Sequence, residues 1–143
     1  MKKRSDPKST SKPPETIRLV LDETIAGHTI LQGLRERGLP VVSLTEFVAR
    51  GATDADVIGS LAGHADAYLI TRDRHFRYHP AIKEKLEAGG VGAFVITSAG
   101  NKTAAQIVDI VAIAWPHIRA FVAQNQRPFA AKIMAMGKIE RHI

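Results

Sequence analysis

Three aspartates that are far apart in the sequence stand where a carboxylate can do chemistry. Asp73 follows an apolar run that ends at Thr71, Asp22 follows a second apolar run, and Asp54 opens a helical pattern. Converging carboxylates repel one another unless they are protonated or bridged by a cation. Mg²⁺ and Mn²⁺ prefer oxygen ligands, and at such a site they activate water and hold a phosphodiester for hydrolysis. The three aspartates therefore predict a Mg²⁺ or Mn²⁺ site, provided that the fold brings them together.

Residues beside the aspartates add to this prediction. Arg72 and Arg74 flank Asp73, and we expect both to contact substrate phosphates. Glu23 adjoins Asp22, where it either assists a metal ligand from the second layer of contacts or only occupies the first turn of a helix. Thr71 is expected to support the ligands without contacting the metal itself.

Each aspartate also has a structural alternative. Asp is a favoured N-cap, so Asp22 can cap a helix that starts near Thr24, and Asp73 can cap a turn. Asp56, three residues after Thr53, is explained by a capping box. Asp54 has no comparable structural role. Singly, each aspartate fits a cap as well as a ligand, whereas the three together at strand ends favour the metal site.

Apolar runs and helical patterns alternate from residue 17 to about residue 125. We predict strands over 17–22, 40–44, 67–71 and 91–96, followed by late strands over 129–136 and 138–142. We predict helices over 24–38, 53–63 and 80–88, and a longest, largely buried helix from Thr103 that Pro116 kinks or ends. This alternation indicates an α/β domain with a central, mainly parallel sheet flanked by helices. Because ligands bind at the carboxyl ends of parallel strands, all three aspartates should lie at that edge.

Charge is distributed unevenly along the 143 residues. The net charge is +6, and residues 1–14 hold five Lys and Arg residues against one Asp. We predict a disordered basic tail over residues 1–15 and a single domain over residues 16–143. The tail can attract nucleic-acid phosphates, or it can be only a solubilising leader.

Composition excludes several classes of protein. The chain has no cysteine, which excludes disulfides and cysteine-bound zinc and fits a cytoplasmic location. No apolar run approaches the ~20 residues of a membrane span, so no membrane partner is expected. The nucleotide-binding and serine-hydrolase motifs GxGxxG, GxxxxGK[ST] and GxSxG do not occur.

The sequence gives little support to two other kinds of site, a histidine zinc site and a receiver-like phosphoacceptor. His75 and His79 have the spacing of zinc ligands on one helix face, but Pro80 disfavours helix at His79. A receiver-like phosphoacceptor would need a lysine after a later strand, and Lys102 is several residues too late.

The motifs resemble those of the PIN-like nuclease superfamily, and within it the compact toxins of the VapC type. The resemblance rests on Leu-Asp-Glu ending at Glu23, Gly-Ala-Thr-Asp ending at Asp54, and Leu-Ile-Thr-Arg-Asp-Arg-His-Phe ending at Phe76. It covers about residues 17–96. It implies a three-layer PIN-like domain that is a Mg²⁺- or Mn²⁺-dependent endoribonuclease, with Asp22, Asp54 and Asp73 as catalytic metal ligands.

The resemblance also implies partners: RNA, a cognate antitoxin protein and a second copy in a homodimer. A fourth acid, common in the superfamily, has no clear match, because neither Asp109 nor Glu84 follows a strand. The alternative is a catalytically inactive PIN-like module that acts through protein partners.

Overall fold

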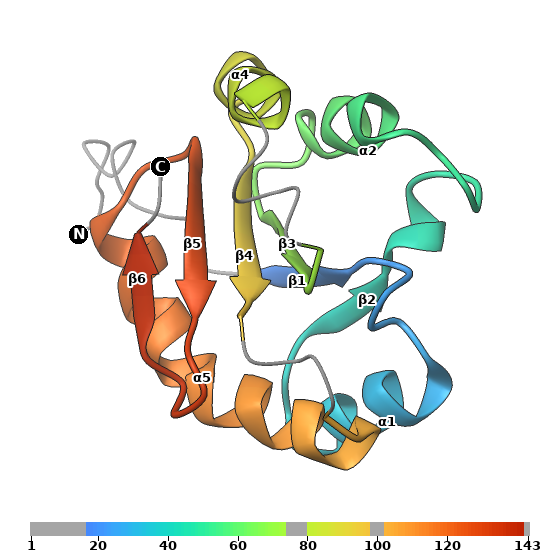
Figure 1. The fold of residues 1–143 in the computed structure, drawn as a ribbon, viewed down its shortest axis with the longest axis vertical. Helices are drawn as coiled ribbons and strands as arrows, with labels where there is room; N and C mark the ends of the chain where they lie inside the picture. The colour runs from blue at the N-terminus through green and yellow to red at the C-terminus, as the bar shows by residue number, and fades with distance from the viewer. Residues whose placement is uncertain (1–16, 74–79, 98–101, 142–143) are drawn as a thin grey trace, which may run out of the picture.

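The computed structural model describes residues 17–73, 80–97 and 102–141, with the backbone alone at residues 80–83. Within these ranges six strands form one sheet in the order β2-β1-β3-β4-β5-β6 (Figure 1). Their bounds are β1 Arg18–Leu21, β2 Val41–Ser43, β3 Ala67–Thr71, β4 Gly92–Ile96, β5 Phe129–Ile133 and β6 Ile139–Arg141. The strands β1 to β5 are parallel and β6 is antiparallel to β5. The mainly parallel sheet predicted from the sequence is confirmed.

Helices cover both faces of the sheet and make the three layers. The helices are α1 His28–Glu36, α2 Asp54–Leu61, α4 Pro80–Gly89 and α5 Ala104–Gln124, with a 3₁₀ helix, η2, at Leu44–Glu46. Helices α1 and α5 lie together on one face, and α2 and α4 lie together on the other (Figure 1).

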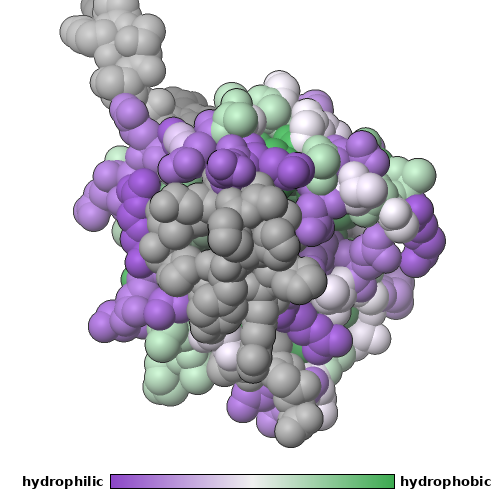
Figure 2. Space-filling model, turned by 45° about the horizontal axis from the view of Figure 1, so that its top comes forward, coloured by the Kyte–Doolittle hydropathy of each residue, from purple (hydrophilic) through white to green (hydrophobic). Residues whose placement is uncertain are grey.

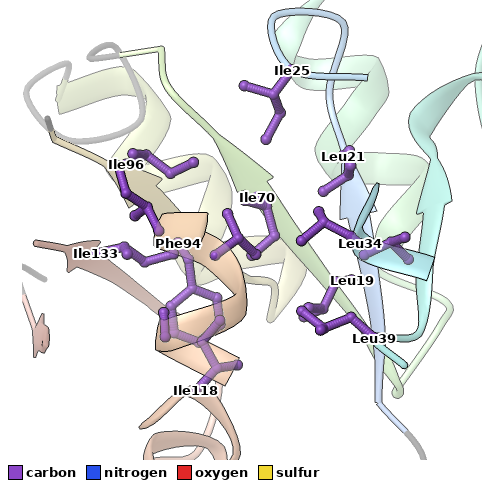
Figure 3. Close-up of a cluster of buried hydrophobic side chains, with 14 of the residues drawn as sticks. Leu19, Leu21, Ile25, Leu34, Leu39, Ile70, Phe94, Ile96, Ile118 and Ile133 are labelled. Carbon is purple, nitrogen blue, oxygen red and sulfur yellow. The ribbon is translucent and has the colours of Figure 1, made fainter. Parts of the chain in front are cut away.

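Each face of the sheet has its own apolar core, because successive side chains of a strand point to opposite faces. Leu19 and Leu21 of β1 join Ile70 and Phe94 under α1 and α5, as Figure 3 shows. Val20, between the two leucines, belongs to the core under α2 and α4. Burying each such side chain contributes roughly 1.5–3 kcal/mol. Burial on both faces explains why the strands read as continuous apolar runs.

The first helix begins later than the sequence predicts. The expected range was 24–38, whereas α1 spans His28–Glu36. The Ile25 N–H donates to the Asp22 carbonyl at 3.1 Å, and this turn occupies the residues expected to be helical. The helix then starts after Gly27, whose extended backbone forms the N-cap. Asp22 is therefore not the N-cap of this helix.

Helix α5 is longer than predicted and is not ended by Pro116, which lies inside it. Proline removes one intrahelical hydrogen bond and crowds the preceding turn. The helix continues because residues on both sides of the proline, among them Ala114, Ile118 and Val122, are buried in the core. Burial is less complete than expected, since Ile113 is 52% exposed. Thr103 and Gln106 form the predicted capping box.

The late strands are shorter than predicted. The first ends at Ile133 rather than at residue 136, because the Gly137 N–H donates to the Met134 carbonyl and turns the chain. Gly137 has a φ of 86°, and an added Cβ would lie 2.7 Å from Ile113 Cγ2. Glycine is the residue that adopts this backbone without a steric cost.

Three predictions were made from composition and charge: a chain without a membrane span, a single domain and a basic tail. The structure bears on the first of them. The described residues in Figure 2 form a mainly hydrophilic surface with small, separate hydrophobic areas. Helix α5 is long and apolar enough to cross a membrane by length and composition alone, although no apolar run of that length was expected. Its buried residues pack against α1 and the sheet, as in the core helix of a globular domain. The predicted tail over residues 1–15 lies outside the described residues.

Candidate active site

The three predicted aspartates line one pocket at the carboxyl edge of the sheet. We call it the acid pocket; it has a volume of about 300 Å³. Its lining is Asp22, Glu23, Thr24, Leu44, Ala52, Asp54, Val57, Leu69 and Asp73. The segments that meet there are the ends of β1 and β3, η2, and the first turn of α2. The convergence expected from parallel strands is therefore present in the structure.

The register of two neighbouring strands places Asp22 beside β3. Leu21 pairs with Ile70, so the next position on β1 lies level with Thr71. The Asp22 N–H extends the ladder by donating to the Ile70 carbonyl at 3.1 Å. Because side chains alternate between faces, Asp22 points to the same side of the sheet as Val20, which packs toward α2 and α4.

Two threonine hydroxyls hold the Asp22 carboxylate, one at each oxygen. The Thr24 hydroxyl and backbone N–H donate to Asp22 Oδ1, the N–H at 3.0 Å. The Thr71 hydroxyl donates to Asp22 Oδ2. Thr71 is fully buried, and its hydroxyl oxygen also accepts from the Asp73 N–H at 2.9 Å. One hydroxyl thus links two of the aspartates, and the supporting role of Thr71 at a metal stays a prediction.

The electrostatics of Asp22 are those of a buried acid without a cation beside it. Burial raises the pKa of the Asp22 carboxyl above its ordinary value, the hydrogen bonds from Thr24 and Thr71 oppose that rise, and the negative charge of Asp73 adds to it. Within the described part of the chain no Lys or Arg forms an ion pair with Asp22. Either a proton or a nearby cation would remove the repulsion between the two carboxylates.

Asp54 reaches the pocket from α2. It is the first residue of the helix, directly after the N-cap Thr53. The predicted capping box is present, since Thr53 and Asp56 exchange side-chain-to-backbone hydrogen bonds at 3.1 and 3.4 Å. Capping therefore accounts for Asp56, as expected, and leaves the half-buried Asp54 available to the pocket. Val57, one turn later on the same helix face, lines the pocket beside it.

Glu23 lines the pocket from the turn after β1. Its side chain is exposed, and its Oε1 accepts a hydrogen bond from the Gly51 N–H at 3.1 Å. Because α1 begins at His28, Glu23 does not occupy the first turn of a helix. Of the two alternatives drawn from the sequence, the helical one is wrong.

The predicted phosphate contacts are described only in part. Arg72 is exposed beside Asp73, and its backbone N–H donates to the Thr24 hydroxyl at 3.4 Å. Arg74 lies outside the described residues, as do His75 and His79. The phosphate-binding role of Arg72 and Arg74 stays a prediction.

Two other acids lie apart from the acid pocket, and so does the lysine that was considered for a receiver-like phosphoacceptor site. Asp109 pairs with Arg37 at 2.6 Å on the exposed side of α5. Glu84 is exposed on α4, and Lys102 is exposed just before α5. None of the three is among the described residues that line the pocket.

Thr24 and the apolar wall of the pocket were not predicted from the sequence. Leu44, Ala52, Val57 and Leu69 line the pocket together with the aspartates. A signal for Thr24 exists, because an Asp followed two residues later by a hydrogen-bonding side chain is typical of a side-chain-stabilised turn. The apolar wall has no such signal, because its residues also read as ordinary core.

The donor set fits a hard divalent cation, although the acids are not gathered as a finished metal site. The pocket is lined by carboxylate and hydroxyl side chains, and hard divalent cations prefer such oxygen ligands. Among the described residues, no three His, Cys, Asp or Glu side chains stand close enough together to hold one ion. Asp54 lines the same pocket from the first turn of α2.

Comparison with known protein families agrees with this fold. A family model described as PIN like domain matches residues 17–98, which include all three aspartates. The chain belongs to this PIN-like family. No curated protein and no solved structure matches the chain. The family is one of nuclease-type folds, and it does not fix the substrate or the subtype.

Proposed function

We propose that the chain is a metal-dependent endoribonuclease that hydrolyses RNA phosphodiesters at the acid pocket. The observation that carries this proposal is the meeting of Asp22, Asp54 and Asp73 in one pocket of a PIN-like domain. A bound Mg²⁺ or Mn²⁺ would supply an activated water and neutralise charge on the phosphate. Asp22, Asp54 and Asp73 would hold the ion, with Thr71 and Glu23 supporting them.

The chain's own residues have separable tasks in this proposal. Thr24 and Thr71 keep the Asp22 carboxylate in one orientation, with each hydroxyl occupying one carboxylate oxygen. Thr71 also fixes the backbone of Asp73. Arg72 and Arg74 would bind the phosphates of the RNA on either side of the cleaved bond. The apolar residues that line the pocket beside the acids would limit the space open to bulk water.

We further propose that the protein is the toxin of a toxin–antitoxin pair of the VapC type, acting in the cytoplasm. A small domain with an RNA-cutting site is harmful unless a partner restrains it, so a cognate antitoxin is the expected protein partner. Two copies are expected to pair. These proposals rest on the resemblance of the motifs and on the family match. A short antitoxin-like reading frame beside the gene would support them.

The second candidate is an inactive PIN-like module that acts through protein partners. One observation favours it: the acids in the described part of the chain are not close enough to form a ready three-ligand site. The two candidates differ in metal affinity. Calorimetry with Mn²⁺ on the full chain and on Asp22→Asn should show binding that depends on Asp22 if the protein is a nuclease. Absence of such binding would leave the inactive module as the better account.

A further inference from the structure

Glu23, a carboxylate of the acid pocket, makes a contact that indicates how it could support the proposed metal ligands. Glu23 reaches from the turn after β1 to Gly51, in the loop that leads into α2. The two residues are 28 positions apart, so the bond joins two separate segments of the pocket. A solvated glutamate in a turn has no need for this bond, which raises the question of what it holds in place.

The end of the bond at β1 is fixed by its neighbours. Asp22, directly before Glu23, is held at both carboxylate oxygens by Thr24 and Thr71. The turn is closed by the bond from the Ile25 N–H to the Asp22 carbonyl. The Glu23 side chain therefore starts from a rigid base.

The other end leads directly to an acid of the pocket. Gly51 precedes Asp54 by three residues and lies within a turn that is closed by the Ala52 N–H donating to the Ala49 carbonyl at 3.2 Å. Gly51 has a φ of 78°, a left-handed conformation that glycine adopts at little cost. The Thr53 capping box then fixes the start of α2. Any shift of Gly51 is carried by this short, ordered stretch to Asp54.

We propose that Glu23 is a positioning residue: its bond to the Gly51 N–H sets where Asp54 stands opposite Asp22 and Asp73. This inference rests on the proposed function, because it assigns Asp54 a role at the metal. Glu23 acts through the loop and does not itself hold the ion. Outer contacts of this kind change metal affinity by about 10–100-fold when they are removed.

The test compares Glu23→Ala with Glu23→Gln in the full chain. Gln keeps an oxygen acceptor for the Gly51 N–H and loses the charge, whereas Ala loses both. We expect Mn²⁺ affinity, measured by calorimetry, to fall about tenfold in Glu23→Ala and to stay within about twofold in Glu23→Gln. Hydrogen exchange at the Gly51 amide, measured without metal, should accelerate only in Glu23→Ala. Glu36→Ala removes an equal charge from the far end of α1 and serves as the control.

A double-mutant cycle with Asp54→Asn decides whether Glu23 acts through Asp54. In the Asp54→Asn background, Glu23→Ala should change Mn²⁺ affinity less than about twofold. If Glu23→Gln loses as much Mn²⁺ affinity as Glu23→Ala, the charge of Glu23 acts on the ion directly and the proposal is wrong. The proposal is also wrong if Glu23→Ala still loses about tenfold in Mn²⁺ affinity in the Asp54→Asn background. Unchanged Mn²⁺ affinity in Glu23→Ala alone would equally overturn it. If the wild-type chain binds no Mn²⁺, the proposed function is wrong, and the inference about Glu23 is wrong with it because it rests on that function.

Discussion

The charged residues at the two edges of the parallel sheet have different hydrogen-bond partners. At the amino edge, Arg18 of β1 forms two hydrogen bonds with Asp66, at 2.7 and 3.1 Å, and lies over the Phe47 ring. Arg127, just before β5, donates to the His64 and Ala67 carbonyls at 3.2 Å each. At the carboxyl edge, Asp22 is held by neutral hydroxyls. Among the described residues, the amino-edge carboxylate of Asp66 is paired with an arginine, whereas the carboxyl-edge Asp22 is held by threonine hydroxyls.

The pKa values of the two aspartates move in opposite directions for that reason. The hydrogen bond from Arg18 holds the pKa of the Asp66 carboxyl below its ordinary value. Burial raises the pKa of the Asp22 carboxyl, and the neighbouring Asp73 adds to the rise. A paired carboxylate stabilises the fold, whereas a buried unpaired carboxylate destabilises it until a cation arrives. The two aspartates therefore contribute to stability with opposite dependence on pH.

The largest expected effect is on RNA cleavage, which should depend on an aspartate at the carboxyl edge and not on one at the amino edge. Asp73→Asn should reduce Mn²⁺-dependent RNA cleavage to the level of the buffer blank and leave the fold intact, because the amide carries no charge for the metal. Asp66→Asn, the same substitution at the amino edge, should keep cleavage. A cleavage assay with circular dichroism on both variants is the measurement. Unchanged metal-dependent cleavage in Asp73→Asn would contradict the assignment of the site.

The second effect concerns the hydroxyl that links two aspartates. Thr71→Val keeps the shape of the side chain but removes the donor to Asp22 and the acceptor for the Asp73 N–H. Cleavage and Mn²⁺ affinity should fall by about 10–100-fold, as for other outer contacts of metal ligands. Thr71→Ser restores the hydroxyl and should recover most of the loss. Equal defects in the Ser and Val variants would assign the effect to packing instead.

The third effect is on stability at the amino edge. Asp66→Asn should lower the free energy of unfolding by about 1 kcal/mol at neutral pH, a small value because both partners are partly exposed to solvent. Since the folded pKa of Asp66 is depressed, its contribution is present above the unfolded pKa and is lost as pH falls through the folded pKa. Denaturant titrations should therefore show the two proteins converging at acid pH. A constant difference across pH would contradict the ion-pair account.

The same measurement at the carboxyl edge should give the opposite sign. Because the folded pKa of Asp22 is raised, the folded state binds more protons, and this group makes stability fall as pH rises from the unfolded to the folded pKa. Asp22→Asn, in protein treated with a chelator, should therefore be more stable than the wild type at neutral pH. The gain should disappear below the unfolded pKa. A loss of stability at neutral pH would mean that the charged form is favoured in the fold.

The smallest effect is expected at an ion pair on neither edge. Arg37 and Asp109 are both exposed and join α1 to α5. Asp109→Asn should change the free energy of unfolding by less than about 0.5 kcal/mol and leave cleavage unaltered. Cleavage lost in this variant would show that a fourth acid acts from outside the acid pocket.

Local signals predicted much of the fold. The apolar runs predicted β1 to β4 to within about two residues, and the Thr53 and Thr103 capping boxes formed as expected. Local signals failed where distant contacts compete with them. Pro116 reads as a helix stop, yet packing carries α5 past it to Gln124. Thr24 reads as a helix start, yet the Asp22 turn delays α1 to His28.

The candidate site shows the same division. Strand ends and a helix start were enough to select the three aspartates and to explain Asp56 as a cap. Nothing in the sequence links Glu23 to Gly51, or Thr71 to the carboxylate of Asp22. Those bonds join residues 28 and 49 positions apart, and they exist only after the strands have paired.

The sequence by itself determined which residues can do chemistry and which elements carry them, because apolar periodicity and capping are properties of neighbouring residues. Only the tertiary structure decided which charges are neutralised. Arg18 meets Asp66 across 48 positions, while Asp22 meets neutral hydroxyls, because the strand order β2-β1-β3 brings together residues that sequence distance keeps apart. Electrostatic compensation depends on separations of a few ångströms. The chain sets those separations only by folding, and they pair Asp66 with Arg18 while they place Asp22 beside the hydroxyls of Thr24 and Thr71.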